Sequence, residues 1–420
     1  MARGMKNSGI EWIGEIPDSW GFARIGSLYT LRNTKVGDTD YPPLSVTNKG
    51  IVPQLETAAK TNAHDDRKLV KQGDFAINSR SDRRGSCGIS RYNGSVSLIN
   101  TILAPNSEMN PQYYDWLFHT VQFADEFYKW GHGIVDDLWT TGWQDMKRIV
   151  IPLPSIEEQA MIASFLDVEC AEFDTLMADV QAQIETLEQY KRSVITEVVT
   201  KGLNPNVPMK DSHVPWIGRI PETWGVDNPK WHFIERKDRA YPGLVQLTAS
   251  QKYGVITQEE YMQRTGARVV VVQKDFDILK LVCPGDFVIH MRSFQGGLEY
   301  SELKGSTSSA YVMLIPKATI LEPRYYRWFF KSDIYIDALS STTNLVRDGQ
   351  AMRWANFIQL PILFPSKEEQ QAIASYLDAK CSEIEAVIDG KRQQLATLEE
   401  YKKSIIFEYV TGKKEVFTYA

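Results

Sequence analysis

Two long stretches of the chain carry apolar residues at helical spacing. After Pro154 and again after Pro365, apolar positions recur in alternating steps of four and three, a pattern typical of helices that pair along a seam. A serine, Ser155 or Ser366, precedes Glu-Glu-Gln at the start of each stretch and resembles the N-cap of a capping box. The pattern therefore predicts two helices of about 40 residues, each roughly 60 Å long.

The predicted seams of the two helices correspond position by position. On the first helix they comprise Ile162, Leu166, Glu169, Phe173, Leu176, Val180, Gln183, Leu187, Tyr190 and Val194. On the second they comprise Ile373, Leu377, Lys380, Ile384, Val387, Lys391, Gln394, Leu398, Tyr401 and Ile405. Gln183 and Gln394 share one register, so polar seam residues are candidates for selecting a single pairing. Antiparallel pairing with each other is the simplest way to cover both seams; the alternative is that the helices only fill a core.

The chain is an internal duplication, because three further motifs also occur twice in the same order. They are WIGEIPDSWG at 12–21 and WIGRIPETWG at 216–225, GDFAINSRS at 73–81 and GDFVIHMRS at 285–293, and PQYYDW at 111–116 and PRYYRW at 323–328. Between these motifs the copies differ: residues 45–61 have only a faint relative in 249–265, and residues 132–143 have none in 342–352. Shared motifs separated by differing residues are expected if each copy recognises a different target. The alternative is drift after duplication.

Each copy begins with a module of mixed secondary structure. Short β-type runs such as 75–78, 269–272 and 287–291 alternate with helix-like segments at 113–130 and 325–339, which predicts α/β or α+β modules. We expect a first module at 1–154, a long helix at 155–204, a second module at 205–365, a second long helix at 366–412 and a tail at 413–420. The fold class is thus two pseudo-twofold-related modules joined by an antiparallel coiled coil, with the paired tryptophans of each module in its core.

Composition places the protein among ordinary globular chains. It has 420 residues, of which 43% are hydrophobic and 24% charged, and no run of about 18 uncharged apolar residues is present to span a bilayer. The first ten residues do not resemble a secretory signal, and Met5 could be the natural initiator. We therefore expect a cytoplasmic protein without a membrane partner, whose four widely spaced cysteines are reduced thiols.

The net charge of −6 conceals an uneven distribution. Residues 151–206 contain 3 basic and 10 acidic residues, whereas residues 207–359 contain 19 and 16. Within the first module, residues 60–91 carry 8 basic residues against 4 acidic ones. The acidity therefore lies mostly on the first long helix, and a cationic patch that could meet phosphate is expected in the first module.

No motif for catalysis is recognisable in the sequence. The nearest match to a phosphate-binding loop, Thr411-Gly-Lys-Lys, lacks both the upstream glycine and the hydroxyl residue. The segments Tyr41-Pro-Pro-Leu and Asn110-Pro-Gln-Tyr imitate an adenine methyltransferase motif poorly, and the six histidines have no ligand spacing. We therefore predict a chain that is not an enzyme, with no catalytic residue and no metal site.

Polar loops supply candidate contacts with nucleic acid. Asn78, Ser79, Arg80, Arg83 and Arg84 follow a predicted strand, and their three guanidiniums suit guanine edges or phosphates. The alternative is that these arginines are solvated or paired with the nearby Asp82. The other candidates lie on the corresponding loop and on further polar loops: Arg292, Ser293, Gln295, Asn48, Lys49, Lys252, Tyr253, Thr343, Asn344 and Arg347.

Together these motifs resemble the specificity subunit of a type I restriction-modification system. The resemblance rests on Trp-Ile-Gly-x-Ile-Pro-x-x-Trp opening each half, Gly-Asp-Phe inside each half, and Pro-x-x-Glu-Glu-Gln before each long helix. It implies two target-recognition domains, each binding one half of a split double-stranded DNA site, held apart by a paired-helix spacer. It also implies two methyltransferase subunits docked along the helices and restriction subunits that translocate DNA, with S-adenosylmethionine and ATP bound by these partners and no cofactor in this chain.

Two other functions remain open at this point. The first is a two-module protein-interaction scaffold that makes no contact with DNA. The second is an enzyme in its own right, such as a fused methyltransferase, against which the missing motifs argue. Binding of a DNA pool by the chain or its complex would separate the first of these from a DNA-reading subunit.

Overall fold

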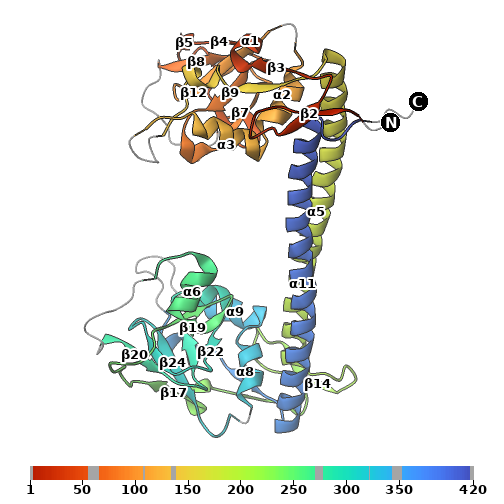
Figure 1. The fold of residues 1–420 in the computed structure, drawn as a ribbon. Coiled ribbons are helices and arrows are strands. Elements are labelled where there is room, and N and C mark those ends of the chain that lie inside the picture. The colour runs from red at the N-terminus through yellow and green to blue at the C-terminus, as the bar shows by residue number, and fades with distance from the viewer. Residues whose placement is uncertain are drawn as a thin grey trace. The chain divides into compact units, whose positions relative to one another are not determined.

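The computed structural model describes residues 3–54, 66–106, 109–133, 139–269, 278–320, 322–342 and 352–416. The chain divides into two compact units, one formed by Met1–Gln181 with Gln393–Ala420 and the other by Ala182–Arg392. Each unit contains one module and a part of both long helices, α5 (Ile156–Lys201) and α11 (Lys367–Val410) (Figure 1). Among the described residues no helix combines the length and hydropathy needed to cross a bilayer.

Module one is built on a four-stranded antiparallel sheet. Its strand order is β10 (Cys87–Ile89), β9 (Phe75–Asn78), β12 (Asn100–Pro105) and β4 (Tyr29–Leu31). Helices α2 (Pro111–Phe118) and α3 (Val121–Lys129) pack on it through a core that includes Phe75, Phe118 and Phe123. The remaining elements are β1 (Met5–Asn7), β2 (Glu15–Pro17), β3 (Gly21–Arg24), α1 (Ile25–Leu28), β5 (Lys35–Val36), β6 (Leu44–Thr47), β7 (Gly50–Pro53), β8 (Arg67–Val70), η1 (Ser81–Arg83), β11 (Gly94–Ser97), α4 (Trp143–Met146) and β13 (Val150–Leu153).

Module two repeats this plan. Its sheet has the order β17 (Phe233–Arg236), β24 (Val312–Pro316), β21 (Phe287–Ile289) and β22 (Glu299–Tyr300), again antiparallel. Helices α8 (Pro323–Phe329) and α9 (Asp333–Ser341) pack on it. The remaining elements are β14 (Met209–Asp211), β15 (Arg219–Pro221), β16 (Gly225–Asp227), η3 (Pro229–Trp231), β18 (Leu247–Ser250), β19 (Gly254–Thr257), α6 (Gln258–Thr265), β20 (Lys280–Val282), α7 (Ser293–Gly296), β23 (Gly305–Thr307), α10 (Trp354–Phe357) and β25 (Ile362–Phe364).

The predicted fold class of two α+β modules joined by two packed long helices is confirmed, with local differences. The helix-like segment at 113–130 is two helices, because Thr120 lies between them and its hydroxyl caps α3 by accepting from the amide of Phe123 at 3.2 Å. The segment at 325–339 also divides into two helices, at Ser332, whose hydroxyl donates to the carbonyl of Phe329 at 2.7 Å instead of capping α9. The predicted strand at 75–78 is present as β9, whereas most of 269–272 lies outside the described residues.

The two long helices begin at the predicted caps and run antiparallel within each unit. The hydroxyls of Ser155 and Ser366 accept the amides three residues later at 3.3 Å. In the first unit Phe165 packs on Tyr409 and Phe173 on Tyr401, so the numbering rises on one helix while it falls on the other. In the second unit ion pairs join Lys191 to Glu385 and Glu188 to Arg392, so the two helices are antiparallel there as well.

The structure corrects four of the ten predicted seam positions on each long helix. The positions that turn inward on α5 are Ile162, Leu166, Cys170, Phe173, Met177, Val180, Ile184, Leu187, Lys191 and Val194, and those on α11 are Ile373, Leu377, Cys381, Ile384, Ile388, Lys391, Leu395, Leu398, Lys402 and Ile405. The predictions of Glu169, Leu176, Gln183 and Tyr190 and of their counterparts on α11 were therefore each wrong by one residue. Leu176 and Tyr190 are 43% and 48% exposed, while their neighbours Met177 and Lys191 lie inside.

The polar residues on the seam are lysines: Lys391 was predicted there, whereas Lys191 and Lys402 take the places predicted for Tyr190 and Tyr401. Gln183 and Gln394 are exposed. Lys191 pairs with Glu385 in the second unit, and its counterpart Lys402 donates to Asp174 at 2.6 Å in the first. The seam thus holds two equivalent ion pairs between the helices, one in each unit.

The repeated motifs fasten each module to the helix pair. Trp20 and Trp224 are buried, as predicted for core residues, and their indole N–H groups donate to glutamates in the first turn of α5 and α11, at 3.0 Å and 3.1 Å. Tyr113 donates its hydroxyl to the carbonyl of Val410 at 2.6 Å, and Tyr325 donates to that of Val199 at 2.8 Å. Each module is therefore attached to the beginning of one long helix and to the end of the other.

Candidate functional site

The arginine loop of module one is held at its first residue by Asn78. The side-chain oxygen of Asn78, at the end of β9, accepts the backbone amide of Arg80 at 3.1 Å. Ser79 is buried, and its hydroxyl lies 3.0 Å from that of Thr101. Both side chains were predicted as DNA contacts, but in the structure their polar atoms bond the protein and shape the loop.

The three arginines of this loop have exposed side chains. The exposed fractions of the Arg80, Arg83 and Arg84 side chains are 42%, 67% and 47%. Arg80 and Arg83 lie 3.6 Å and 3.8 Å from Asp82, distances longer than a direct hydrogen bond. Pairing with Asp82, the alternative considered from the sequence, is therefore present at distances beyond a direct hydrogen bond.

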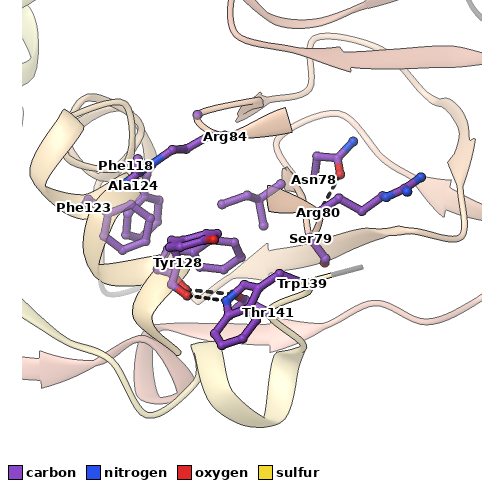
Figure 2. A pocket seen from close by; sticks show the side chains of 13 residues that line it. Asn78, Ser79, Arg80, Arg84, Phe118, Phe123, Ala124, Tyr128, Trp139 and Thr141 are labelled. Carbon is purple, nitrogen blue, oxygen red and sulfur yellow. Dashed lines mark hydrogen bonds between the residues drawn. The ribbon is translucent and has the colours of Figure 1, made fainter. Parts of the chain in front are cut away.

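Arg84 is held more firmly, beside an aromatic pocket. Its guanidinium pairs with Asp125 and lies 5.2 Å from the ring centre of Tyr128, both on α3. Figure 2 shows Arg84 and Arg80 on either side of this pocket, which is also lined by Phe118, Phe123 and Trp139. Arg84 and Arg80 therefore both form part of the pocket wall, and Arg83 has the most exposed side chain of the three.

A segment that differs between the copies lies directly beside Arg80. The amide of Thr141 donates to the carbonyl of Ser79 at 2.9 Å, and Thr140 forms a backbone bridge with Arg80. The indole N–H of Trp139 donates to the carbonyl of Tyr128 at 2.9 Å (Figure 2). Trp139 and Tyr128 were missed from the sequence, although the lack of a counterpart for residues 132–143 was a usable signal.

The hairpin β6–β7 places a second predicted pair near the arginine loop. Asn48 and Lys49 form its exposed two-residue tip. At the end of this tip Gly50 lies so close to Gly88 of β10 that a Cβ on Gly88 would come within 2.8 Å of the Gly50 Cα. The hairpin therefore packs on the strand that follows the arginine loop, and both polar loops belong to one region of module one.

The predicted cationic patch at 60–91 is smaller than the residue count suggested. Arg67 is buried and donates to the hydroxyl and carbonyl of Ser95, at 2.8 Å and 2.9 Å. Lys68 donates to the carbonyl of Asn100 at 2.7 Å, and burial lowers the pKa of its ammonium group. These two cations stabilise the module and are not available to phosphate, which leaves the arginine loop as the main exposed part of the patch.

Module two has an equivalent loop with different chemistry. Arg292 and Gln295 are exposed, whereas Ser293, also predicted as a contact, is fully buried and bonds the amide of His290 at 2.9 Å. The tip of hairpin β18–β19 reaches this loop, because Gln251 donates to the carbonyl of Arg292 at 3.0 Å. The same two elements, a strand-end loop and a hairpin tip, therefore come together in both modules.

The remaining predicted contacts of module two have different outcomes. Lys252 and Tyr253 lie at the hairpin tip, where the ammonium of Lys252 and the guanidinium of Arg264 both lie over the Tyr253 ring, at 5.2 Å and 5.1 Å from its centre. Thr343, Asn344 and Arg347 lie outside the described residues. In the described ranges no group of three or more His, Cys, Asp or Glu side chains could hold a metal ion.

Two relatives match nearly the full length of the chain, although no family model matches it. It is 28% identical over 445 residues to the protein assigned as the specificity subunit of the type I restriction enzyme MjaX of Methanocaldococcus jannaschii, covering 97% of this chain and 96% of the relative. It is 24% identical over 438 residues to the type I restriction enzyme MjaVIII specificity subunit of the same organism, covering 96% and 94%.

Solved structures share the fold. A chain from work on complex assembly and conformational transition of the type I R-M system superposes with a TM-score of 0.70 at 14% identity, covering 95% of this chain and 99% of that one. The HsdS subunit from Thermoanaerobacter tengcongensis gives a TM-score of 0.50 at 15% identity, covering 95% and 98%. At these identities the likeness concerns the fold alone, two modules joined by two long helices.

Proposed function

Because this chain belongs to the specificity subunits of type I restriction-modification systems, which are non-catalytic, we propose that it reads a two-part sequence in double-stranded DNA for partner enzymes. Module one reads one half of the target and module two reads the other half. The two long helices set the unread gap between the halves. Reading by each module depends on the strand-end loop and the hairpin tip beside it.

The observation that carries this proposal is the division between shared and unlike residues within each module. The shared residues, among them Trp20 and Tyr113 with their counterparts, make the same hydrogen bonds to the long helices in both units. The unlike residues lie around the shared Arg80 and Arg292 in the strand-end loops and at the hairpin tips, where exposed arginine, lysine and amide side chains are found. A common frame with two different polar surfaces suits two different DNA half-sites.

In module one Arg80 and Arg83 are the proposed DNA contacts, with Asn48 and Lys49 beside them. In module two they are Arg292, Gln295, Lys252 and Tyr253, together with the predicted Thr343, Asn344 and Arg347. Asn78, Ser79 and Ser293 support these loops through bonds to the protein. Arg84 contributes positive potential from the pocket wall.

The partners follow from membership of the family. We propose that two methyltransferase subunits, using S-adenosylmethionine, and restriction subunits, using ATP, assemble with this chain. The acidic first long helix, with 3 basic and 10 acidic residues over 151–206, offers a surface for protein rather than for DNA. Adenine methylation would then be made by the partners at positions that this chain selects.

Mapping of methylated adenines tests the proposal directly. Cells that carry this chain with its partner subunits should methylate a split sequence, and cells without this chain should lose methylation at that sequence. A complex that assembles but neither binds nor methylates any DNA would support a protein-interaction scaffold instead. Inserting four residues into both long helices adds about 6 Å to each and should lengthen the gap in the methylated sequence; an unchanged gap would contradict the spacer role.

The contribution of the arginine loop can be measured separately. Replacing Arg80, Arg83 and Arg84 together by alanine should weaken binding at the first half-site and leave the second half-site recognised. Because each phosphate contact adds about 0.9 to the slope of log affinity against log salt, the slope should fall by about 2, from Arg80 and Arg83. Unchanged affinity at both low and high salt would remove this loop from the interface.

A further inference from the structure

Module two contains a buried charged cluster beneath its strand-end loop. Glu299 on β22 and His290 at the end of β21 have side chains that are 3% and 6% exposed. The ammonium of Lys331, which follows α8, pairs with Glu299 and is 22% exposed. Burial of a carboxylate and an ammonium costs free energy even when they are paired, so this cluster needs an explanation beyond filling the core.

The cluster holds both ends of the loop. At the start of the loop, Nδ1 of His290 accepts the backbone amide of Arg292 at 3.3 Å. At its end, the ammonium of Lys331 donates to the carbonyl of Gly296 at 2.9 Å as well as to Glu299. Arg292 and Gln295, the two exposed side chains proposed to contact DNA, lie between these two attachments.

Glu299 links the two attachments. Since Nδ1 of His290 accepts a hydrogen bond, the proton of the neutral ring lies on Nε2. That atom is buried, has no hydrogen-bond partner among the described residues, and lies 3.7 Å from the Glu299 carboxylate. The same carboxylate oxygen, Oε1 of Glu299, therefore lies next to both His290 and Lys331, and one buried charge is shared by both ends of the loop.

Module one holds its strand-end loop without such a charged cluster. Asn78 takes the place of His290 and accepts the corresponding amide of Arg80 at 3.1 Å. Gly88, which pairs with Ala76 as Glu299 pairs with Val288, occupies the place of Glu299 and leaves no carboxylate there. The cluster therefore belongs to the part of module two that differs from module one, although it is too deeply buried to contact DNA.

We infer that His290, Glu299 and Lys331 are positioning residues that fix the Arg292–Gln295 loop of module two for reading the second half-site. This inference rests on the proposed function of that loop. Loss of the Glu299 charge releases both ends of the loop. His290 loses the carboxylate that lies beside its Nε2 atom, and Lys331 loses the carboxylate with which it forms an ion pair. The arginine and glutamine then sample several directions, and the second half-site is bound more weakly and less selectively.

The test measures DNA binding by the full chain assembled with its methyltransferase subunits. The DNA duplexes carry the target sequence identified by methylation mapping, or that sequence with either half scrambled. Glu299→Gln keeps the shape of the side chain and removes its charge. We expect about a tenfold loss of affinity for the complete target, the size of one well-made base contact. Binding to DNA with only the first half-site intact should change by less than about twofold. Glu302→Gln is the matched control, because Glu302 is 75% exposed and pairs only loosely with Arg327 at 3.7 Å.

Two further variants separate positioning from general destabilisation. His290→Asn installs the residue that module one uses and should retain more affinity than His290→Ala, because an amide oxygen can still accept the Arg292 amide. In a double-mutant cycle, Glu299→Gln should add little to a loop that already carries Arg292→Ala and Gln295→Ala. Additive losses, or equal losses at both half-sites, would overturn the positioning role.

Failure of this inference is distinguishable from failure of the proposed function. If Arg292→Ala and Gln295→Ala together leave binding at the second half-site unchanged, the loop does not read DNA and the proposed function of this loop is wrong. If those substitutions weaken binding while Glu299→Gln has no effect, the loop reads DNA without the buried cluster, and only the inference is wrong.

Discussion

Removal of one aspartate from each Gly-Asp-Phe motif should destabilise the two modules unequally. Asp74 accepts Nε and Nη2 of Arg32 at 2.5 Å and 2.9 Å and the amide of Lys71 at 2.8 Å, and its side chain is 3% exposed. Asp286 makes the same three bonds, to Arg236 at 2.7 Å and 2.9 Å and to the amide of Cys283 at 2.8 Å. The internal duplication therefore supplies a natural control.

The two modules differ in the carboxylate partners that the arginine keeps after the aspartate is removed. In the described parts of the chain Arg32 pairs with Asp74 alone, whereas Arg236 also donates to Asp238 at 2.8 Å. Asp74→Ala leaves the guanidinium of Arg32, whose side chain is 23% exposed, without a carboxylate, which costs about 3–5 kcal/mol. Asp286→Ala should cost about 1 kcal/mol less, because the exposed pair with Asp238 remains.

Calorimetry of the full chain can measure this difference. At about 2–4 °C per kcal/mol for a unit of this size, Asp74→Ala should lower the midpoint of the first unit by about 6–20 °C. Hydrogen exchange read by peptide should show lost protection in the unit that carries the substitution. Asp238→Ala, at an exposed carboxylate, is the control. A shift below about 2 °C for Asp74→Ala, or equal shifts for the two aspartates, would refute the reasoning.

Three further predictions concern the helix pair and its attachment to the modules. Tyr325→Phe should cost about 1–2 kcal/mol of unfolding free energy in denaturant titration, because it leaves a buried helix-end carbonyl without its donor; a neutral result would contradict this attachment. Lys402→Met removes the pair with Asp174, which is 61% exposed, and should change stability by less than about 1 kcal/mol; a larger loss would show that the pair is essential for pairing. Burial raises the pKa of Cys170 and Cys381 to about 11, so iodoacetamide should label neither thiol in the folded protein at pH 8.5, whereas denatured protein should be labelled; rapid labelling of the native chain would contradict the packed seam.

The sequence was a good guide wherever a local pattern has one structural solution. A serine before Glu-Glu-Gln caps a helix irrespective of its surroundings, so Ser155 and Ser366 were identified correctly. The repeated tryptophans were predicted as core or packing residues because they share one frame in both copies; Trp12, Trp20 and Trp224 are buried and Trp216 is partly buried. The order of the motifs also established the duplication and indicated the resemblance to type I specificity subunits.

The seam shows where local patterns stop being sufficient. A seam whose spacing alternates as four, three has the same average period as one that alternates as three, four. The spacing alone therefore does not decide whether Leu176 or Met177, or whether Tyr190 or Lys191, lies on the seam. The sequence favoured the more apolar member in the second case, but the structure places Lys191 inside because Glu385 on the partner helix pairs with it. A partner that is distant in sequence decides such choices.

The candidate site was predicted in its location but not in its roles. The strand ends and the exposed arginines could be read from the sequence, since a polar run after an apolar strand must leave the sheet. Whether Ser293 faces solvent or the core depends on α9, which packs against the short helix α7 that contains Ser293. The links from Glu299 to His290 and Lys331 join residues 9 and 32 positions apart.

The amino-acid sequence by itself determined the duplication, the long helices with their caps, and the polar loops at the strand ends, because each depends on residues close together in the chain. The tertiary structure alone decided which face of each helix is buried, which cations remain exposed, and which buried charges support a loop. Those outcomes depend on packing between segments far apart in the chain, where burial makes an unpaired charge costly and so selects its partner.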